Sequence, residues 1–377
     1  MSILQTKVNT QSESFKQNRK DLLALSEHIN ELEGRVHAAS NKKRELFKKR
    51  GQLLPRDRLA LLLDPGSSFI ELSTLAGYAQ HDDDGDKNVY GAGIIVGIGF
   101  VEGTRCMVYI NDAAIKGGTN MPQSYDKLRR AQDIASHSKL PFLCLVQSGG
   151  GNLFLQHLGF NRAGHRFMTQ ARSSAAGIPQ ITVVHGASTA GGAYIPGMSD
   201  YVIMVRGKAR AYLAGPPLLK AATGEISEEE ELGGAEMHAR TSGLGDLLAE
   251  DDAHAIEMTR EVVKGLCWNE RLPELKQKTY KEPRYDIDEL CGIVPIDYKK
   301  PYDCREVIAR LADDSDFVEF KENYDSFTIC GFAEIEGQAC GFIGNNGPIT
   351  NNGAGKASQF IQLCCQAGKP IIFLQNT

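Results

Sequence analysis

Paired cysteines and long apolar runs are both missing from this 377-residue sequence. Its nine cysteines are scattered without a CxxC pair, and only Cys364 and Cys365 are adjacent. This spacing suggests neither a disulfide framework nor a zinc site, so we expect reduced core cysteines and no bound metal. No apolar run reaches the length of a membrane span, and the first 35 residues contain none of signal-peptide length. We therefore expect a soluble intracellular protein with no membrane partner.

Excess positive charge and the common catalytic signatures are missing as well. Lys and Arg number 42 against 47 Asp and Glu, so a nucleic-acid partner is not expected. "GIGFVEG" does not fit the dinucleotide fingerprint, "NNGAGKAS" lacks the upstream glycine of a phosphate loop, and no GxSxG elbow occurs. His157, His165 and His185 have no partners at a defined spacing, and we interpret them as structural or surface residues.

The elements that are present indicate an α/β fold. Residues 13–50 are polar and helix-forming, and we interpret the basic block "KKRELFKKR" (42–50) as a solvated helix face. From Gly91 onward, "GAGIIVGIGFVEGTRCMVYIND" predicts two strands joined at Glu102-Gly103. Two stretches then follow the order helix, proline, buried strand and glycines, which is typical of parallel strands with crossover helices.

Internal repetition indicates a duplicated unit. "VEGTRCMVYIND" (101–112) aligns without a gap with "IEGQACGFIGNN" (335–346), and a helical run follows each copy. Strand-like stretches then come in the same order, "LPFLCLVQ" from Leu140 and "KPIIFLQN" from Lys369. The second copy stops where the first reaches its glycines. We expect roughly 100 to 170 residues of a second domain to be missing, which predicts a fragment or a truncated product.

Two glycine clusters follow the predicted strands, "SGGGN" (148–152) and "TAGGAY" (189–194). At the carboxyl ends of parallel strands, free backbone N–H groups can hold a phosphate or stabilise an oxyanion on a thioester carbonyl. A plain turn remains the alternative for either cluster. The acidic run "SEEEE" (227–231) is interpreted as a capping box of Ser227 and Glu230 rather than a metal site.

Several motifs together resemble the carboxyltransferase β subunits of biotin-dependent acyl-CoA carboxylases. They are "KGGT" (116–119), "SGGGN", "GIPQITVVHGASTAGGAYIPGMSDY" (177–201), "YLAGPPLLKAATGE" (212–225) and "ELGGAEMHARTSG" (231–243). The first and fourth resemble the 3-methylcrotonyl-CoA and geranyl-CoA branch. The resemblance implies tandem crotonase-like β-β-α superhelix domains, the second one truncated. It divides the chain into a helical segment (1–60), an N-terminal carboxyltransferase domain (61–285) and the first part of a C-terminal domain (286–377).

The resemblance also implies a mechanism that needs no side-chain base. Carboxybiotin arrives on a biotin carboxylase and carrier subunit, gives up CO2, and its ureido nitrogen takes the proton from the acyl-CoA. The amides of Gly191 and Gly192 form an oxyanion hole for the enolate. The residues implied to bind the acyl-CoA are Ser148, Gly149, Gly150, Gly151, Lys116, Gly117, Gly118, Ala163, Gly164 and Ala193.

The sequence also departs from the family. "LFLQHLGFNRAGHRF" after the first glycine cluster is shorter and less polar than in methylcrotonyl-type members, and Ala163 and Gly164 stand where those members have bulkier side chains. A roomier pocket for geranyl-CoA or another long branched enoyl-CoA follows. The resemblance implies a homo-oligomer, a hexamer core, located in a bacterial cytoplasm or a mitochondrial matrix.

Three alternatives remain open. A propionyl-CoA or acetyl-CoA specificity would keep the same reaction with another substrate. A biotin-independent decarboxylase or hydratase would act on CoA esters with the same oxyanion holes. An inactive assembly fragment would follow from the early stop.

Overall fold

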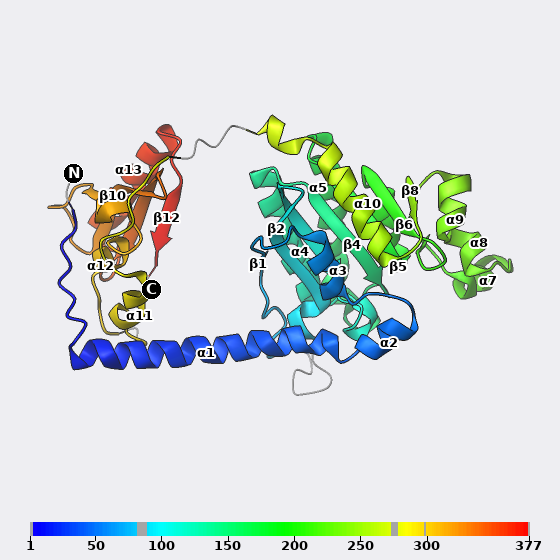
Figure 1. Cartoon of the computed structure of the whole chain (residues 1–377), viewed down its shortest axis with the longest axis horizontal. Coiled ribbons are helices and arrows are strands. Elements are labelled where there is room, and N and C mark those ends of the chain that lie inside the picture. The colour runs from blue at the N-terminus through cyan, green and yellow to red at the C-terminus, as the bar shows by residue number, and fades with distance from the viewer. Residues whose placement is uncertain (1–2, 81–88, 273–277, 298, 376–377) are drawn as a thin grey trace. The chain divides into compact units, whose positions relative to one another are not determined.

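The computed structural model describes residues 3–80, 89–272, 278–297 and 299–375. Contacts divide the chain into two compact units (Figure 1). Unit 1 comprises Met1–Asn30 and Glu274–Thr377, and unit 2 comprises Glu31–Pro273. Helix α1 (Glu13–Asn41) contributes residues to both.

Unit 2 is built on an eight-stranded mixed sheet. Its strands are β1 (Ile70–Glu71), β2 (Ile94–Val101), β3 (Thr104–Asn111), β4 (Phe142–Ser148), β5 (Gln180–Thr189), β6 (Tyr201–Val205), β7 (Arg210–Tyr212) and β8 (Leu247–Ala249). They lie in the order β1-β2-β3-β4-β5-β6-β8, and β7 pairs with β5. The first three strands are antiparallel neighbours and β3 to β8 run parallel. The parallel part is the arrangement predicted from the helix and strand order.

Helices cover both faces of this sheet. The α-helices of unit 2 that follow α1 are α2 (Arg44–Lys49), α3 (Pro55–Leu62), α4 (Pro122–Ser138), α5 (Gln156–Ala175), α6 (Tyr194–Gly197), α7 (Pro216–Thr223), α8 (Glu229–Gly233), α9 (Ala235–Met237) and α10 (Asp252–Gly265). Short 3-10 helices are η1 (Tyr90–Gly93), η2 (Lys116–Gly118), η3 (Leu153–Leu155), η4 (Ala190–Ala193) and η6 (Trp268–Arg271), and η5 (His238–Ser242) is a π-helix.

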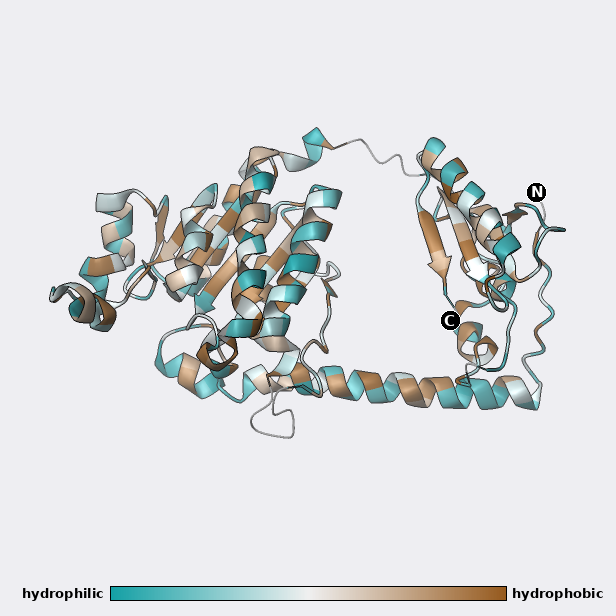
Figure 2. Ribbon diagram, turned by 180° about the vertical axis from the view of Figure 1, so that it is seen from behind, coloured by the Kyte–Doolittle hydropathy of each residue, from teal (hydrophilic) through white to brown (hydrophobic). Residues whose placement is uncertain are grey.

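The strands are apolar along their whole length because both faces of the sheet are buried. On one face, alternate residues such as Val96, Tyr109 and Val146 pack against α4. On the other, their neighbours such as Val108 and Leu145 pack against α3 and α10. Figure 2 shows the hydrophobic strands between more polar helices. The result is a three-layer α/β architecture.

Unit 1 has a smaller sheet with helices on its two faces. Its four strands lie in the order β12-β11-β10-β9, namely β9 (Val318–Glu319), β10 (Thr328–Ile335), β11 (Gln338–Asn345) and β12 (Ile371–Leu374). Its helices are α11 (Leu290–Ile293), α12 (Cys304–Ile308) and α13 (Asn351–Gln366), with 3-10 helices η7 (Ile287–Glu289) and η8 (Asp313–Ser315). Ile308 of α12 packs on one face and Phe360 of α13 on the other.

Strand registers support the predicted duplication. Met107 on β3 pairs with Phe142 on β4, and the equivalent Gly341 on β11 pairs with Ile371 on β12. These are the positions that the sequence alignment places opposite each other. The two units therefore repeat the same hairpin, helix and parallel strand.

The duplication extends further upstream than the sequence alignment reached. Glu71 on β1 pairs with Gly97 and is bonded by both terminal nitrogens of Arg56. In unit 1, Glu319 on β9 pairs with Gly331 and also accepts two hydrogen bonds from one arginine, here from Nε and Nη2 of Arg305. The alignment missed these pairs because the intervening loops differ in length.

The predicted capping box at Ser227 and Glu230 is wrong. Helix α8 begins at Glu229, with Glu228 as its N-cap. The Glu230 carboxylate instead pairs with Arg210 at 2.8 Å. The predicted domain boundaries, 1–60, 61–285 and 286–377, stay predictions.

Candidate active site

Both glycine clusters lie at the carboxyl ends of neighbouring parallel strands. Ser148, the last residue of β4, pairs with Ser188 near the end of β5. A cavity of about 310 Å3 opens beside them. Six of the predicted site residues line it: Gly150, Gly151, Ala163, Gly164, Gly191 and Gly192. The remaining lining residues are Asn120, Pro122, Tyr125, Asn152, Leu153, Leu155, Gly159, Phe160, Arg166, Phe167 and Ala190.

The fold itself does not require glycine at positions 191 and 192. Neither has a left-handed backbone, and an added Cβ would lie 4.0 Å from Phe167 at position 191 and 3.4 Å from the Ser188 hydroxyl at position 192. Both belong to η4, whose first N–H groups lack partners within a helix. No described residue outside η4 accepts a hydrogen bond from either amide. The missing side chains therefore serve to keep the cavity open beside these amides.

Other glycines of the site are needed by the backbone. Gly118 has φ +70°, and a Cβ there would lie 2.3 Å from the Gln147 carbonyl oxygen. Gly150 has φ +96°. The Ser148 hydroxyl donates to the Gly118 carbonyl at 2.7 Å and accepts from the Gly150 amide at 3.1 Å. Ser148 thus joins the loop after β3 to the loop after β4.

The structure separates the other predicted binding residues from this cavity. Ser148, Gly149, Gly118 and Ala193 do not line it, and Lys116 and Gly117 line a second cavity of about 560 Å3. The Gly149 amide donates to the Gly117 carbonyl at 3.1 Å, so the two cavities meet at adjoining loops.

The second cavity is rich in cations. Lys42, Lys43, Arg50 and Lys116 line it, together with Ala39, Leu46, Phe47, Tyr90, Ala113, Ala114, Ile115 and Gly117. The first three come from the basic block that we interpreted as a solvated helix face. They are exposed, as predicted, but they gather around one hollow that suits an anionic group.

Sequence reasoning missed the two ionisable side chains that line the first cavity. Tyr125 on α4 and Arg166 on α5 both stand in helices that gave no catalytic signature. Burial raises the pKa of the Tyr125 phenol, which keeps it neutral. Ala190 was missed as well. Its φ of +52° is unusual for a residue other than glycine, but this backbone angle is visible only in the structure. A helical spacing of Ala163, Arg166 and Phe167 along one face is the signal that points to α5.

His185 is a buried structural residue, as predicted for it. Its Nδ1 lies 2.8 Å from Asp252, whose other oxygen accepts from Arg58 Nη2 at 2.9 Å. Burial and the charge of Arg58 lower the His185 pKa to about 4, so the ring is neutral. Burial raises the pKa of Asp252, but hydrogen bonding to His185 and the charges of His185 and Arg58 outweigh this and lower it to about 2. These groups do not line the cavity.

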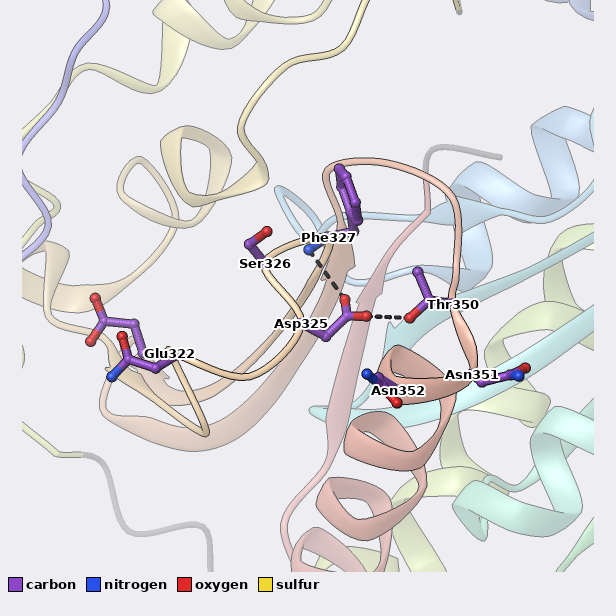
Figure 3. A pocket seen from close by; sticks show the side chains of 8 residues that line it. Glu322, Asp325, Ser326, Phe327, Thr350, Asn351 and Asn352 are labelled. Carbon is purple, nitrogen blue, oxygen red and sulfur yellow. Dashed lines mark hydrogen bonds between the residues drawn. The ribbon is translucent and has the colours of Figure 1, made fainter.

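Unit 1 has an open hollow at the start of α13 (Figure 3). Its volume is about 750 Å3, and Figure 3 shows Asp325, Phe327 and Thr350 at its rim. The Asp325 carboxylate accepts from the Thr350 hydroxyl, and these hydrogen bonds, with those from the Phe327 and Thr328 amides, lower its pKa. Asp325 therefore fixes the loop before β10 to the N-cap of α13. Its carboxylate is occupied with this structural role.

Neither a metal cluster nor a membrane helix is found in the part of the chain that the structure describes. No group of three or more His, Cys, Asp or Glu side chains there has a metal-binding arrangement. No described helix combines the length and apolar character needed to cross a membrane.

Fold and site together define a crotonase-like protein with glycine-built backbone sites at its strand ends. The carboxyl transferase domain model matches residues 47–377. The chain is 43% identical over 397 aligned residues to the probable methylcrotonoyl-CoA carboxylase beta chain of Drosophila melanogaster, covering all of this chain and 68% of that protein. The chain belongs to the carboxyl transferase family of acyl-CoA carboxylase beta subunits.

Solved structures agree with this membership. The β subunit of Pseudomonas aeruginosa geranyl-CoA carboxylase is 50% identical with a TM-score of 0.91, covering 99% of this chain and 71% of that one. Transcarboxylase 12S, described as a hexamer, is 28% identical with a TM-score of 0.59, covering 93% and 70%. The chain spans 55% to 68% of the length of its methylcrotonoyl-CoA carboxylase and mycobacterial relatives.

Proposed function

We propose that this chain is the carboxyltransferase part of a biotin-dependent carboxylase acting on a branched enoyl-CoA, geranyl-CoA or 3-methylcrotonyl-CoA. The observation that carries the proposal is the pair Gly191 and Gly192. The fold tolerates a Cβ at both positions, yet both are glycine and both line the cavity. A thioester oxygen placed there meets backbone donors without steric hindrance, and one such donor contributes on the order of 3 kcal/mol to an oxyanion.

The site residues fit a reaction whose base and carboxyl group come from another subunit. Tyr125 and Arg166 are the ionisable side chains at the cavity in the described residues, and neither is a carboxylate or histidine base. Carboxybiotin, delivered by a biotin carboxylase and carrier subunit, supplies both the carboxyl group and the base. This chain then binds the thioester, stabilises the enolate oxygen at η4 and keeps water out of an apolar pocket.

The cationic cavity suits the phosphates of coenzyme A. This second cavity is lined by Lys42, Lys43, Arg50 and Lys116. The hydrogen bond from Gly149 to Gly117 joins its loop to the loop beside the first cavity, which we call the acyl cavity. Clustered Lys and Arg side chains are the usual partners of phosphate groups. We therefore assign Lys116 and Gly117 to the nucleotide end of the substrate. Ser148, Gly149 and Gly118 fix the loops between the two cavities, and Ala193 is the last residue of η4.

Small residues on α5 favour a long acyl group. Ala163 and Gly164 line the cavity, and an added Cβ at Gly164 would meet nothing within 4 Å. The close similarity to a geranyl-CoA carboxylase subunit supports the same choice. We therefore place geranyl-CoA before 3-methylcrotonyl-CoA. We expect the protein in a bacterial cytoplasm, or in the mitochondrial matrix if its source is eukaryotic.

The test is carboxyl transfer by the complete gene product assembled with its biotin subunit. Transfer is measured with geranyl-CoA, 3-methylcrotonyl-CoA and propionyl-CoA, for the wild type and for Gly192→Val. We expect the branched enoyl esters to react. We expect the variant to lose at least about 100-fold in rate, because the valine side chain keeps the thioester oxygen away from an oxyanion donor that contributes that much.

Gly265→Val is the matched control. Gly265 also lacks a left-handed backbone and has open space around it, but it lies on α10 away from the cavity. Near wild-type transfer by Gly192→Val would refute the oxyanion assignment. Turnover of propionyl-CoA alone would refute the branch, and decarboxylation of malonyl-type esters without biotin would favour the other enzyme class.

A further inference from the structure

One of the residues that line the acyl cavity is a buried cation. Arg166 lines the cavity from α5, and only 8% of its surface is exposed. Its guanidinium lies over the Tyr109 ring, 4.9 Å from the ring centroid. In the described part of the chain, Arg166 forms no ion pair with a carboxylate, whereas many other arginines do.

The contrast with other arginines is informative. Arg58 and Arg310 are more deeply buried, and each is paired with carboxylates, Arg58 with Asp252 and Arg310 with Glu289. Arg162, one turn before Arg166 on α5, pairs with Asp126 at the surface. A buried charge without a counter-ion is costly, and proteins normally pair or solvate it. Arg166 departs from this rule while it lines a cavity.

The immediate surroundings of Arg166 do not supply the missing charge. Tyr109 and Cys144 lie beside it on β3 and β4, and burial raises the pKa of both groups even though the Arg166 charge acts in the opposite direction. Both are therefore neutral at ordinary pH. Arg166 is also hydrogen-bonded to both of these side chains, and its guanidinium lies over the Tyr109 ring. These neutral partners use part of its five N–H donors but bring no negative charge.

The rest of the cavity is largely apolar. Leu155, Phe160, Ala163 and Phe167 also line it. A purely hydrocarbon acyl chain filling this space would remove the remaining water from Arg166 and give nothing back. A carboxylate would restore the balance, because a guanidinium binds it with two parallel charge-assisted hydrogen bonds.

We propose that Arg166 is a carboxylate-binding residue of the acyl cavity. The inference rests on the proposed function, which places an acyl-CoA in this cavity. The carboxylate has two possible sources with the same chemistry. It is either the carboxyl group newly transferred to the acyl chain, or a second carboxylate that the acyl-CoA already bears at its far end.

The test compares binding of three CoA esters to the assembled holoenzyme by calorimetry. The esters are geranyl-CoA, its carboxylated product, and a geranyl-CoA analogue with a carboxylate at the far end of the chain. The variants are Arg166→Met, Arg166→Lys and the control Arg162→Met, each checked for an unchanged melting temperature.

We expect Arg166→Met to weaken a carboxylated ester about 10-fold or more, the size of a charged hydrogen bond, and to leave geranyl-CoA within about threefold. Arg166→Lys restores part of the loss because it keeps the charge without the fork. Loss confined to the product identifies the transferred carboxyl group, and loss confined to the analogue identifies a second carboxylate.

Equal effects on all three esters, or none, would overturn the proposal, as would a similar pattern in Arg162→Met. If Arg166→Met unfolds the protein, Arg166→Lys alone still decides, since selective weakening of one carboxylated ester supports the proposal and uniform binding contradicts it. Failure of the proposed function would give a different result. The carboxylated esters would still lose affinity in Arg166→Met, but the wild-type holoenzyme would transfer no carboxyl group.

Discussion

At the scale of single residues, His185 and Asp252 make the folded state sensitive to acid. The His185 pKa of about 4 in the fold lies below its ordinary value of about 6.5, so the unfolded chain binds the proton first. Stability is therefore lost as pH falls from about 6.5 towards 4. Asp252, with its pKa lowered to about 2, adds a second loss below its ordinary value of about 3.9.

We predict that the melting temperature falls steadily between pH 7 and pH 4.5, reflecting a loss on the order of 3 kcal/mol from His185. His185→Gln removes the titrating ring and keeps a donor for Asp252, so its melting temperature should be lower at pH 7 but change less with pH. Calorimetric scans across this range check it. A variant with the same acid slope as the wild type would show that other groups cause the loss.

At the scale of elements, an aspartate holds each hairpin turn of the duplicated unit. Glu102 and Gly103 both have positive φ, as the two-residue turn between β2 and β3 requires. The Asp64 carboxylate accepts from both amides, at 2.8 and 2.7 Å. Asp313 accepts from the Glu336 and Gly337 amides at the same two distances. The turn conformation is thus fixed by a residue outside the hairpin.

We predict that Asp64→Ala costs at least roughly 2 kcal/mol of stability, since the hydrogen bonds from both turn amides are lost together with the Asp64–Arg260 ion pair. The Glu102 and Gly103 amides should then exchange hydrogen faster, which exchange measured by mass spectrometry detects. Asp313→Ala is the matched change in unit 1 and should affect only the Glu336 and Gly337 amides. Unchanged exchange at both turns would mean that the turn residues suffice alone.

At the scale of the whole molecule, apolar side chains beside the acyl cavity point to assembly. Leu153, Phe154 and Phe160 are 76%, 91% and 79% exposed. Large exposed apolar groups in one region commonly mark an interface. From this exposure we propose that these residues are covered by another subunit.

We predict that light scattering of the complete gene product gives a multi-subunit mass, and that Phe154→Glu lowers it by burying an unpaired charge. Phe154 does not line the cavity, so the isolated subunit should keep its fold by circular dichroism. A wild-type protein that runs as a monomer, or a variant with the same mass, would contradict this interface.

The sequence determined the parts of this protein that depend on local pattern. Continuous apolar strands, crossover helices and the turn at Glu102-Gly103 follow from residue order, and the gapless alignment of 101–112 with 335–346 predicted a register that the strands confirm. The motifs likewise indicated the carboxyl transferase family, which the comparisons confirm. Such features are encoded over short stretches, where propensity and spacing act directly.

Only the tertiary structure decided which residues meet. Gly150 and Gly191 line one cavity, while Lys116 and Gly117 line another, although the Gly117 carbonyl accepts a hydrogen bond from Gly149 just after the end of β4. No sequence motif marks Arg166, and its buried, unpaired charge follows from the packing that places it over the Tyr109 ring of β3. Sequence fixes which groups are available, but burial and pairing arise between distant segments, so their electrostatic consequences appear only once the chain is folded.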